Sequence, residues 1–289
     1  MGAFWGSVAD MLVQQVPVGD NIFDVQLDGE EGDVPVLLLH GFPQSPHSYD
    51  AVTPRLHAAG LRTIVPAQRG YSAGARPLRL DEYSMPHLVS DIVGLLDALG
   101  VGWVHLVGHD WGAAVAWQVA ARHPNRVSSL VVASVGHPVA FSQALKNDLE
   151  QREASSYMKL FGQADKAEDL LLADGGRRLR AMVATGGQTD AQVRACTDPL
   201  LERPALTAAL NWYRAMRAED YSDCPPVEVA TTFLWSTGDT ALRRSQAEST
   251  RRFVRGDYRF VELKDVTHWI PEQAAPELAS EIVRRSSPW

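Results

Sequence analysis

The sequence contains few cysteines and no excess of positive charge. Cys196 and Cys224 are the two cysteines in 289 residues, and their spacing fits neither a metal-ligand motif nor a disulfide framework. Lysine and arginine number 27 against 35 acidic residues, which gives a formal net charge of −8. No lysine and arginine cluster is dense enough to follow a phosphate backbone, so we expect no nucleic-acid partner. Two ordinary thiols indicate a reducing compartment, and we expect the cytoplasm.

The chain also lacks long apolar runs, internal repeats and low-complexity tracts. No stretch approaches the roughly 20 apolar residues that a membrane span requires. Residues 1–10 have neither the basic start nor the apolar core of a signal peptide, and we treat them as an N-terminal extension. At 45% hydrophobic content the remaining chain can bury a full core. We therefore expect no membrane partner, and we leave the oligomeric state open, with a homodimer as one alternative.

The most informative stretch surrounds Asp110. An apolar, β-branched run over 101–107 meets Gly108-His109-Asp110-Trp111-Gly112, and an alanine-rich helical pattern follows through Ala121. This pattern predicts a strand, a sharp turn and a helix. The glycines bracket Asp110 at the spacing of a nucleophile elbow, where small neighbours let strand and helix pack closely. Asp110 would then lie at the tip of the turn, beside a helix N-terminus that favours a carboxylate.

An aspartate at this position narrows the chemistry. A carboxylate that attacks a saturated carbon forms an ester, which water can cleave at the carbonyl, whereas a serine would be left as a stable ether. Asp110 therefore suits a substrate with an sp3 carbon and a leaving group, such as an epoxide or a carbon–halogen bond. The alternative is an aspartate that only caps the following helix.

Buried strands alternate with helical patterns along most of the chain. We expect a hairpin from strands 11–18 and 21–27, further strands at 34–39, 62–66, 101–107, 126–135, 231–236 and 258–263, and helices at 47–59, 85–99, 245–254 and 276–285. Residues 139–223 read as helical and polar, with turns at 174–176 and 185–187 and no strand. This order predicts an α/β fold with a mostly parallel, doubly wound sheet, a core of 11–138 and 224–289, and a helical cap over 139–223.

Four short motifs resemble those of one family. They are His-Gly-Phe-Pro at 40–43, Gly-His-Asp-Trp-Gly at 108–112, Gly-Asp at 238–239 and Thr-His-Trp at 267–269. Their order, nucleophile then acid then histidine, is similar to that of the α/β-hydrolase fold. The aspartate nucleophile resembles that of epoxide hydrolases and of the related haloalkane and fluoroacetate dehalogenases. The resemblance runs from about residue 11 to the end of the chain.

The resemblance also implies roles for a histidine and an acid. His268 follows a strand and precedes a helix, so it can reach the elbow and activate the water that cleaves the ester. Asp239 would accept from the other ring nitrogen and fix the tautomer, with Asp265 as the alternative acid. Four further histidines lie in or beside strands or before a proline, where packing is the simpler explanation: His105, His109, His123 and His137. The family normally has glycine before this histidine, and Thr267 departs from that pattern.

The turn after the first buried strand is expected to supply half of an oxyanion hole. The backbone N–H groups of Phe42 and Trp111 would stabilise the charge that develops on the Asp110 carboxyl during ester hydrolysis. His40, Gly41 and Pro43 would support this turn. By resemblance we also expect a cis peptide bond between Phe42 and Pro43.

Two tyrosines in the expected cap decide between substrate classes. Tyr213, in Asn-Trp-Tyr-Arg, and Tyr157, in Ser-Tyr-Met-Lys-Leu-Phe, resemble the two cap tyrosines of epoxide hydrolases. Their hydroxyls could polarise an epoxide oxygen and then protonate it, whereas a halide needs no proton. The alternative is that they are amphipathic packing residues.

Two positions disfavour dehalogenation. Haloalkane dehalogenases often have asparagine where this chain has Phe42, and fluoroacetate dehalogenases typically have arginine where it has Trp111. We therefore predict a cofactor-free epoxide hydrolase that takes a small apolar epoxide and forms an ester on Asp110. A dehalogenase with the same nucleophile and a non-catalytic protein that binds small molecules remain the alternatives.

Overall fold

The computed structural model describes residues 12–30 and 32–286, and the structural statements below refer to these residues. The expected extension over 1–10 and the first residue of the expected hairpin lie outside them. Within the described chain, one eight-stranded sheet has the order β1-β2-β4-β3-β5-β6-β7-β8. Its strands are β1 (Leu12–Val18), β2 (Asn21–Asp28), β3 (Val34–Leu39), β4 (Leu61–Pro66), β5 (Val104–His109), β6 (Val127–Ala133), β7 (Ala230–Ser236) and β8 (Tyr258–Leu263).

The sheet is antiparallel at one edge and parallel elsewhere. β1 pairs antiparallel with β2, and β2 pairs antiparallel with β4, while every pair from β4 to β8 is parallel. The inner strands are buried on both faces, which explains why β3 reads as the continuous apolar run Val-Pro-Val-Leu-Leu-Leu. The expected mostly parallel, doubly wound sheet is therefore confirmed.

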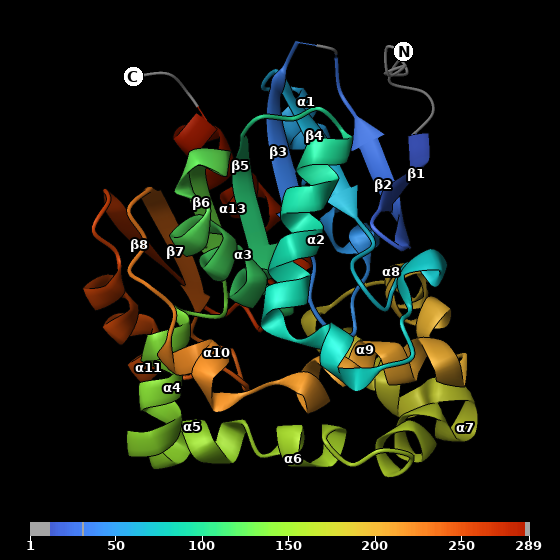
Figure 1. The fold of residues 1–289 in the computed structure, drawn as a ribbon. Coiled ribbons are helices and arrows are strands. Elements are labelled where there is room, and N and C mark those ends of the chain that lie inside the picture. The colour runs from blue at the N-terminus through green and yellow to red at the C-terminus, as the bar shows by residue number, and fades with distance from the viewer. Residues whose placement is uncertain (1–11, 31, 287–289) are drawn as a thin grey trace.

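Helices cover both faces of the sheet. α2 (Met85–Ala98), α3 (Trp111–Arg122) and α11 (Arg244–Ser249) contribute to the apolar core on one face. α1 (Thr53–His57), α12 (Ile270–Gln273) and α13 (Ala275–Ser286) contribute to the core on the other face. Figure 1 shows α2 and α3 in front of the sheet and α13 behind it.

The order of the strands creates a crevice at one end of the sheet. β3 lies between β4 and β5 in the sheet. The chain therefore runs from β3 to β4 on one side of it and later returns to β5 on its other side. Loops that follow β3 and β5 therefore meet at the carboxyl ends of the strands, the place where open α/β sheets bind ligands. Leu39 at the end of β3 pairs with Gly108 near the end of β5, which brings the two glycine-containing turns side by side.

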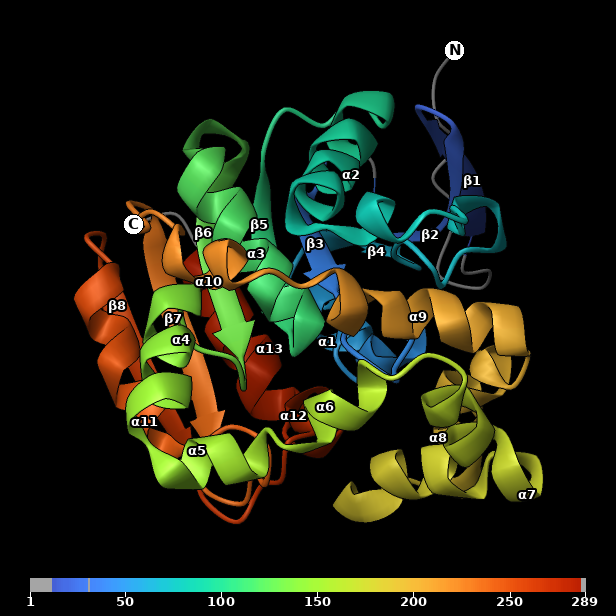
Figure 2. The same cartoon turned by 60° about the horizontal axis from the view of Figure 1, so that its bottom comes forward.

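The segment between β6 and β7 is mostly helical, with an extended stretch over 224–229 before β7. It contains α4 (Pro138–Asn147), α5 (Leu149–Ala154), α6 (Tyr157–Phe161), α7 (Lys166–Val183), α8 (Asp190–Thr197), α9 (Arg203–Ala215) and α10 (Ala218–Ser222). These helices lie across the carboxyl ends of the strands (Figures 1 and 2). A turn interrupts α7 as expected, since residues 173–176 have non-helical backbone angles and Asp174 has a φ of 52°.

Three elements differ from the sequence-based expectation. The helix expected over 47–59 is a 3-10 turn at Pro46–Tyr49 followed by the short α1, because Pro54 cannot donate to a carbonyl one turn earlier. β5 begins at Val104 rather than 101, since the N–H of Val101 donates to Leu96 and closes α2. The helix expected over 245–254 ends as α11 at Ser249 and continues as a 3-10 turn.

Candidate active site

Asp110 lies at the tip of a sharp turn between β5 and α3. Its φ of 51° and ψ of −120° fall in a region that residues with a side chain rarely adopt. Glycine is needed on both sides of it, because a side chain at Gly108 would overlap the backbone of Gly112, and one at Gly112 would overlap the backbone of Leu39. This backbone holds the Asp110 carboxylate out of the helix, and it caps no N–H of α3. The helix-cap alternative is therefore wrong.

The carboxylate of Asp110 is bound on one oxygen and faces a histidine with the other. Oδ1 accepts the backbone N–H of Phe42 at 2.8 Å, and Oδ2 lies 3.5 Å from Nε2 of His268. Burial would raise the pKa of Asp110, but the contact with His268 outweighs it and holds that pKa below the ordinary value. Asp110 is therefore ionised at neutral pH.

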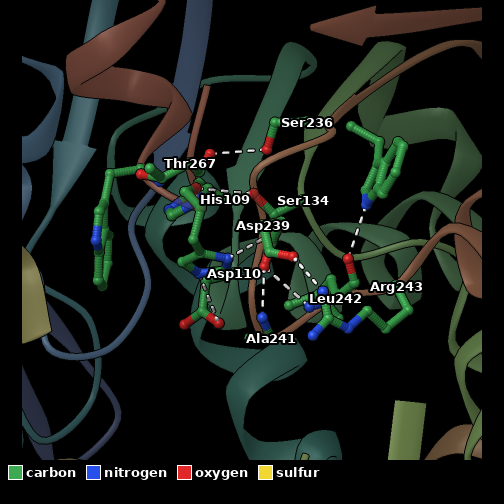
Figure 3. Close-up of polar contacts among 12 residues, drawn as sticks. His109, Asp110, Ser134, Ser236, Asp239, Ala241, Leu242, Arg243 and Thr267 are labelled. Carbon is green, nitrogen blue, oxygen red and sulfur yellow. Dashed lines mark hydrogen bonds and ion pairs between the residues drawn. The ribbon is translucent and has the colours of Figure 1, made fainter. Parts of the chain in front are cut away.

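His268 is held from its other side by an aspartate. Asp239 follows β7, His268 follows β8, and Nδ1 of the histidine donates to Oδ2 of Asp239 over 2.8 Å. The second oxygen of Asp239 accepts the N–H groups of Ala241 and Leu242 at 2.8 and 2.9 Å. Figure 3 shows these contacts around Asp239. Nδ1 of His268 therefore carries a proton, and Nε2 is the ring atom that faces Asp110.

The charges around His268 set its protonation. Burial alone would lower its pKa, but the carboxylates of Asp239 and Asp110 together raise that pKa to about 10. His268 is therefore a cation while both carboxylates are ionised. Loss of either negative charge lowers its pKa and favours the neutral ring.

The other candidate acid and histidines lie elsewhere. Asp265 is exposed, and its backbone N–H bonds to Thr237. His105 contacts the Ser129 hydroxyl, and His137 caps α4. His123 ends α3, 13 residues along the chain from Asp110. His109 lies within the site, but its ring contacts Gln44 and the carbonyl of His268 rather than the nucleophile.

The turn that follows β3 brings the N–H of Phe42 to Asp110. The peptide bond between Phe42 and Pro43 is cis, as the resemblance implies. A side chain at Gly41 would overlap the carboxylate of Asp110, so this position requires glycine. The buried ring of His40 donates from Nδ1 to the carbonyl of Gly41 and accepts the N–H of Gln68 on Nε2. Burial lowers the pKa of His40 to about 4, which keeps this ring neutral.

Trp111 occupies the first position of α3, directly after the nucleophile. The first N–H groups of a helix have no acceptor within the helix, so this N–H is free for a ligand. The Trp111 ring packs edge-on against Tyr213, with ring centres 5.1 Å apart. Both expected N–H donors therefore adjoin Asp110.

Tyr157 begins α6 and Tyr213 lies on α9, and both face the nucleophile. Their ring centres are 6.3 Å apart, and Phe42 packs edge-on against Tyr213. Burial raises the pKa of Tyr213 well above its ordinary value, and burial beside Asp110 raises that of Tyr157 as well. Both phenols therefore keep their protons at neutral pH.

Two hollows of different size meet at Asp110 and Tyr157. The larger has a volume of about 470 Å³ and extends past His268 to Arg178, Met182 and Trp269. The smaller has a volume of about 30 Å³ and is walled by aromatic side chains, among them Phe141, Tyr213 and Tyr221. The larger lining is mostly apolar. In the described chain, no group of three or more histidine, cysteine or carboxylate side chains is placed to hold a metal ion.

Sequence patterns did not single out several residues that support the site. Gln44 and Glu272 contact each other behind His109, and the Ser134 hydroxyl donates to the carbonyl of His268. Thr267, which replaces the usual glycine, bonds through its N–H and hydroxyl to Gln273. A carboxylate four residues after His268, within the largely apolar segment Trp-Ile-Pro-Glu, was the one available signal for Glu272.

The helices between β6 and β7 are fixed to the sheet by specific contacts. The indole N–H of Trp212, next to Tyr213, donates to the carbonyl of Arg69 at 2.9 Å. Trp269, next to His268, donates to the hydroxyl of Thr185 at 2.8 Å. Among the described helices, none combines the length and apolar character that crossing a membrane would require.

Comparison with known proteins agrees with this architecture. The family described as alpha/beta hydrolase fold matches residues 34–275. The AB hydrolase superfamily protein YfhM of Bacillus subtilis is 30% identical over 88% of this chain and 90% of its own. Epoxide hydrolase 3 of Xenopus tropicalis is 29% identical over 91% of this chain and 73% of its own.

A solved structure extends the likeness to three dimensions. The crystal structure of epoxide hydrolase VrEH1 from Vigna radiata is 25% identical, covers 96% of this chain and 98% of its own, and has a TM-score of 0.83. The chain therefore belongs to the α/β-hydrolase family, in its epoxide hydrolase-like group.

Proposed function

We propose that this protein is an epoxide hydrolase that converts an epoxide to a vicinal diol through a covalent ester on Asp110. The observation that carries the proposal is an ionised carboxylate in place of a serine at the elbow, with two protonated tyrosines beside it. Relatives that are themselves named epoxide hydrolases support it. The helices over 139–223 act as the cap that supplies the tyrosines.

Ring opening is the first step. Phe42 holds Oδ1 of Asp110, so Oδ2 attacks an epoxide carbon and the carbon–oxygen bond of the ring breaks. The departing oxygen takes a proton from Tyr157 or Tyr213, which hydrogen-bonds to it before the attack. The phenolate that remains regains a proton from the His268 imidazolium or from solvent.

Ester formation prepares the histidine for the second step. An ester at Asp110 carries no charge, so His268 loses one of the two anions that raise its pKa. Neutral His268 then accepts a proton from water, and the hydroxide attacks the ester carbonyl. The N–H groups of Phe42 and Trp111 stabilise the negative oxygen, a contribution of roughly 10²–10³ in rate for one donor at comparable sites. Collapse releases the diol, which takes the proton back from His268.

The two hollows limit the shape of the substrate. A volume of about 30 Å³ holds one or two water-sized groups, whereas about 470 Å³ holds a long or branched apolar substituent. An epoxide with one large apolar substituent and a small opposite end fits both. A dehalogenase reaction would leave the tyrosine hydroxyls unused, and a purely binding protein would not need the paired aspartates around His268.

A single turnover in ¹⁸O-labelled water tests the covalent route. With enzyme in excess over a terminal epoxide, the oxygen added to the first diol should come from Asp110, so the diol should be unlabelled and the Asp110 peptide labelled. Label in the first diol would instead mean direct attack by water. A wild-type protein that opens no epoxide in a panel of aryl, alkyl and terminal epoxides, but displaces halide, would overturn the assignment.

A further inference from the structure

A chain of buried polar side chains runs from the backbone of His268 to Glu272. The carbonyl of His268 lies 2.8 Å from Nε2 of His109, and Nδ1 of His109 lies 2.8 Å from Oε1 of the side-chain amide of Gln44. That amide lies 2.5 Å from a carboxyl oxygen of Glu272, which is 228 residues away in the chain. His109 and Gln44 are fully buried. The mechanism above uses none of these three side chains.

The hydrogen bonds around His109 fix where protons can lie. A carbonyl oxygen only accepts, so Nε2 of His109 must donate to His268. Burial lowers the pKa of His109 to about 3, so the ring is neutral and Nδ1 must accept. The structure places the oxygen of Gln44 toward Nδ1 and its NH₂ toward Glu272. The two ends of an amide have nearly the same shape, and the protons on His109 favour the amide turned over, with its NH₂ toward Nδ1 and its oxygen toward Glu272. With the amide as placed, either His109 carries a second proton, or its one proton lies on Nδ1 and the lone pair of Nε2 faces the carbonyl of His268.

With the Gln44 oxygen facing it, Glu272 must supply a proton. A separation of 2.5 Å is short for an N–H donor but lies in the range of an O–H donor. The second carboxyl oxygen of Glu272 is buried and has no hydrogen-bond partner in the described chain, a position that is costly for a charged carboxylate. As long as Nε2 of His109 donates to His268, the two orientations of Gln44 differ only in whether one proton lies on Glu272 or on His109.

The surroundings of Glu272 favour the protonated acid. Burial raises its pKa to about 8 even with the NH₂ of Gln44 placed as a donor to it, a contact that lowers this pKa, as does the nearby charge of His268. Asp50 also raises the pKa of Glu272. Its other titratable neighbours are Tyr49 and Cys196, both neutral because burial raises their pKa values.

We propose that Glu272 is a positioning residue that works as a neutral acid. It donates to Gln44, Gln44 donates to Nδ1 of His109, and Nε2 of His109 holds the carbonyl of His268. The proposal rests on the proposed function, because it is the hydrolytic step that depends on the place of His268. Two further donors share that carbonyl, the hydroxyl of Ser134 at 3.0 Å and the N–H of Ile270 at 2.9 Å.

Ionisation of Glu272 reverses the direction of the hydrogen bonds from Glu272 through Gln44 to His109. A carboxylate needs a donor, so Gln44 turns its NH₂ to Glu272 and its oxygen to His109. The proton of His109 then moves to Nδ1, and the lone pair on Nε2 faces the carbonyl of His268. The hydrogen bond that held the carbonyl of His268 is replaced by a repulsion between two lone pairs, so ester hydrolysis should slow as the pH rises through about 8.

The tautomer of His109 can be read directly by NMR, without activity. In ¹⁵N-histidine-labelled protein, with the His109 signals assigned by their loss in His109→Asn, the ring should be the Nε2–H tautomer at pH 6.5. It should convert to the Nδ1–H tautomer or broaden above pH 8.5 in the wild type, and remain Nε2–H in Glu272→Gln. An Nδ1–H ring at pH 6.5, or a tautomer that changes with pH in Glu272→Gln, would overturn the proposal.

Stopped-flow kinetics then link the tautomer to the reaction. Glu272→Gln offers an uncharged donor, so it should hydrolyse the ester near the wild-type rate at pH 7 and lose the fall above pH 8. Glu272→Met cannot donate and should hydrolyse about five- to tenfold more slowly at pH 7, the size of one net hydrogen bond. Alkylation should change less than twofold in both. Glu277→Gln, exposed on α13, is the matched control and should keep the wild-type profile.

The readouts separate this proposal from the function itself. A protein that opens no epoxide but shows the pH-dependent tautomer retains the positioning role and loses the proposed function. If the wild type hydrolyses epoxides but the rate of ester hydrolysis by Glu272→Gln still falls above pH 8, the proposed function stands and the role of Glu272 is refuted. Circular dichroism of each variant verifies the fold, and if Glu272→Met does not fold, the comparison of Glu272→Gln with Glu277→Gln decides.

Discussion

The backbone N–H of Phe42 donates to Oδ1 of Asp110 at 2.8 Å, although the two residues are 68 positions apart in the chain. β3 and β5 are neighbours in the sheet, so the turns that follow them meet at one point. One end of the nucleophile is thereby fixed before any substrate is present. The predictions below start from this arrangement.

Glycine at position 41 should be essential for the reaction, whereas the rest of the chain should fold without it. In Gly41→Ala the added methyl group overlaps the Asp110 carboxylate and pushes it from the Phe42 N–H. We expect the rate of ester formation and kcat/KM to fall roughly 100-fold or more, as for the loss of an oxyanion donor. Gly102→Ala, where a methyl group meets nothing within 4 Å, is the control and should react like the wild type.

Replacing His268 should separate the two halves of the reaction. Asp110 can still attack in His268→Gln, but no group takes the proton from water, so the ester should accumulate. Intact-protein mass spectrometry after incubation with a good substrate should show an adduct of the substrate mass. Protein of unchanged mass, with wild-type consumption of substrate, would contradict this role.

The tyrosines should matter for epoxides in particular. Tyr213→Phe and Tyr157→Phe should each slow alkylation by an epoxide, and the double change should slow it roughly 100-fold or more, within the range of general acid catalysis. Any displacement of halide should be affected less. If the double variant forms the ester at the wild-type rate in rapid-quench experiments, the tyrosines serve packing alone.

The two chemical steps should lose rate at different acidities. The pKa of Asp110 is held below its ordinary value, so alkylation should stay constant down to about pH 5 and fall only near or below pH 4. Hydrolysis needs neutral His268. In the ester Asp110 no longer raises the pKa of this ring but Asp239 still does, so this step should slow as the pH falls. Wild-type enzyme quenched during turnover should therefore carry more ester at pH 5 than at pH 7.5, and equal amounts at both pH values would refute this division.

Arg178 should give a preference for epoxides with an anionic end. It lines the larger hollow, and in the described chain it makes no ion pair, while Arg177 pairs with Asp174 and Arg180 with Asp198. Arg178→Gln should lower kcat/KM for an epoxide carboxylate about two- to fivefold relative to its methyl ester. Added salt should reduce the preference in the wild type. Arg177→Gln is the matched control. An equal loss of relative kcat/KM in that variant would show that Arg178 does not determine the preference.

The sequence was informative where a single residue type is imposed by local geometry. Asp110 and its two glycines could be recognised because the sharp turn tolerates few alternatives, and the strands because buried parallel strands are continuously apolar. The ends of elements were less certain, since Pro54 interrupts a pattern that otherwise reads as one helix. Gln44 and Glu272 escaped notice because only the folded chain brings together residues so far apart.

The contact between Trp212 and Arg69 distinguishes α9, which it fixes against the core, from α7, which lines the larger hollow. Arg69 lies in the turn after β4 and is held by two hydrogen bonds to Asp91, each of 2.6 Å, so the carbonyl that accepts the Trp212 indole N–H belongs to a fixed part of the core. Tyr213 therefore takes its place from this turn, whereas α7 lines the wide hollow with Arg178 and contacts α9 through the buried ion pair of Glu168 with Arg214. Exchange of α7 with that of a relative should transfer substrate preference if it keeps a carboxylate for Arg214, while exchange of α9 would also have to bring a new partner for the carbonyl of Arg69. Selectivity can therefore change in α7 without loss of reactivity, as long as the contact of Glu168 with Arg214, next to Tyr213, is kept.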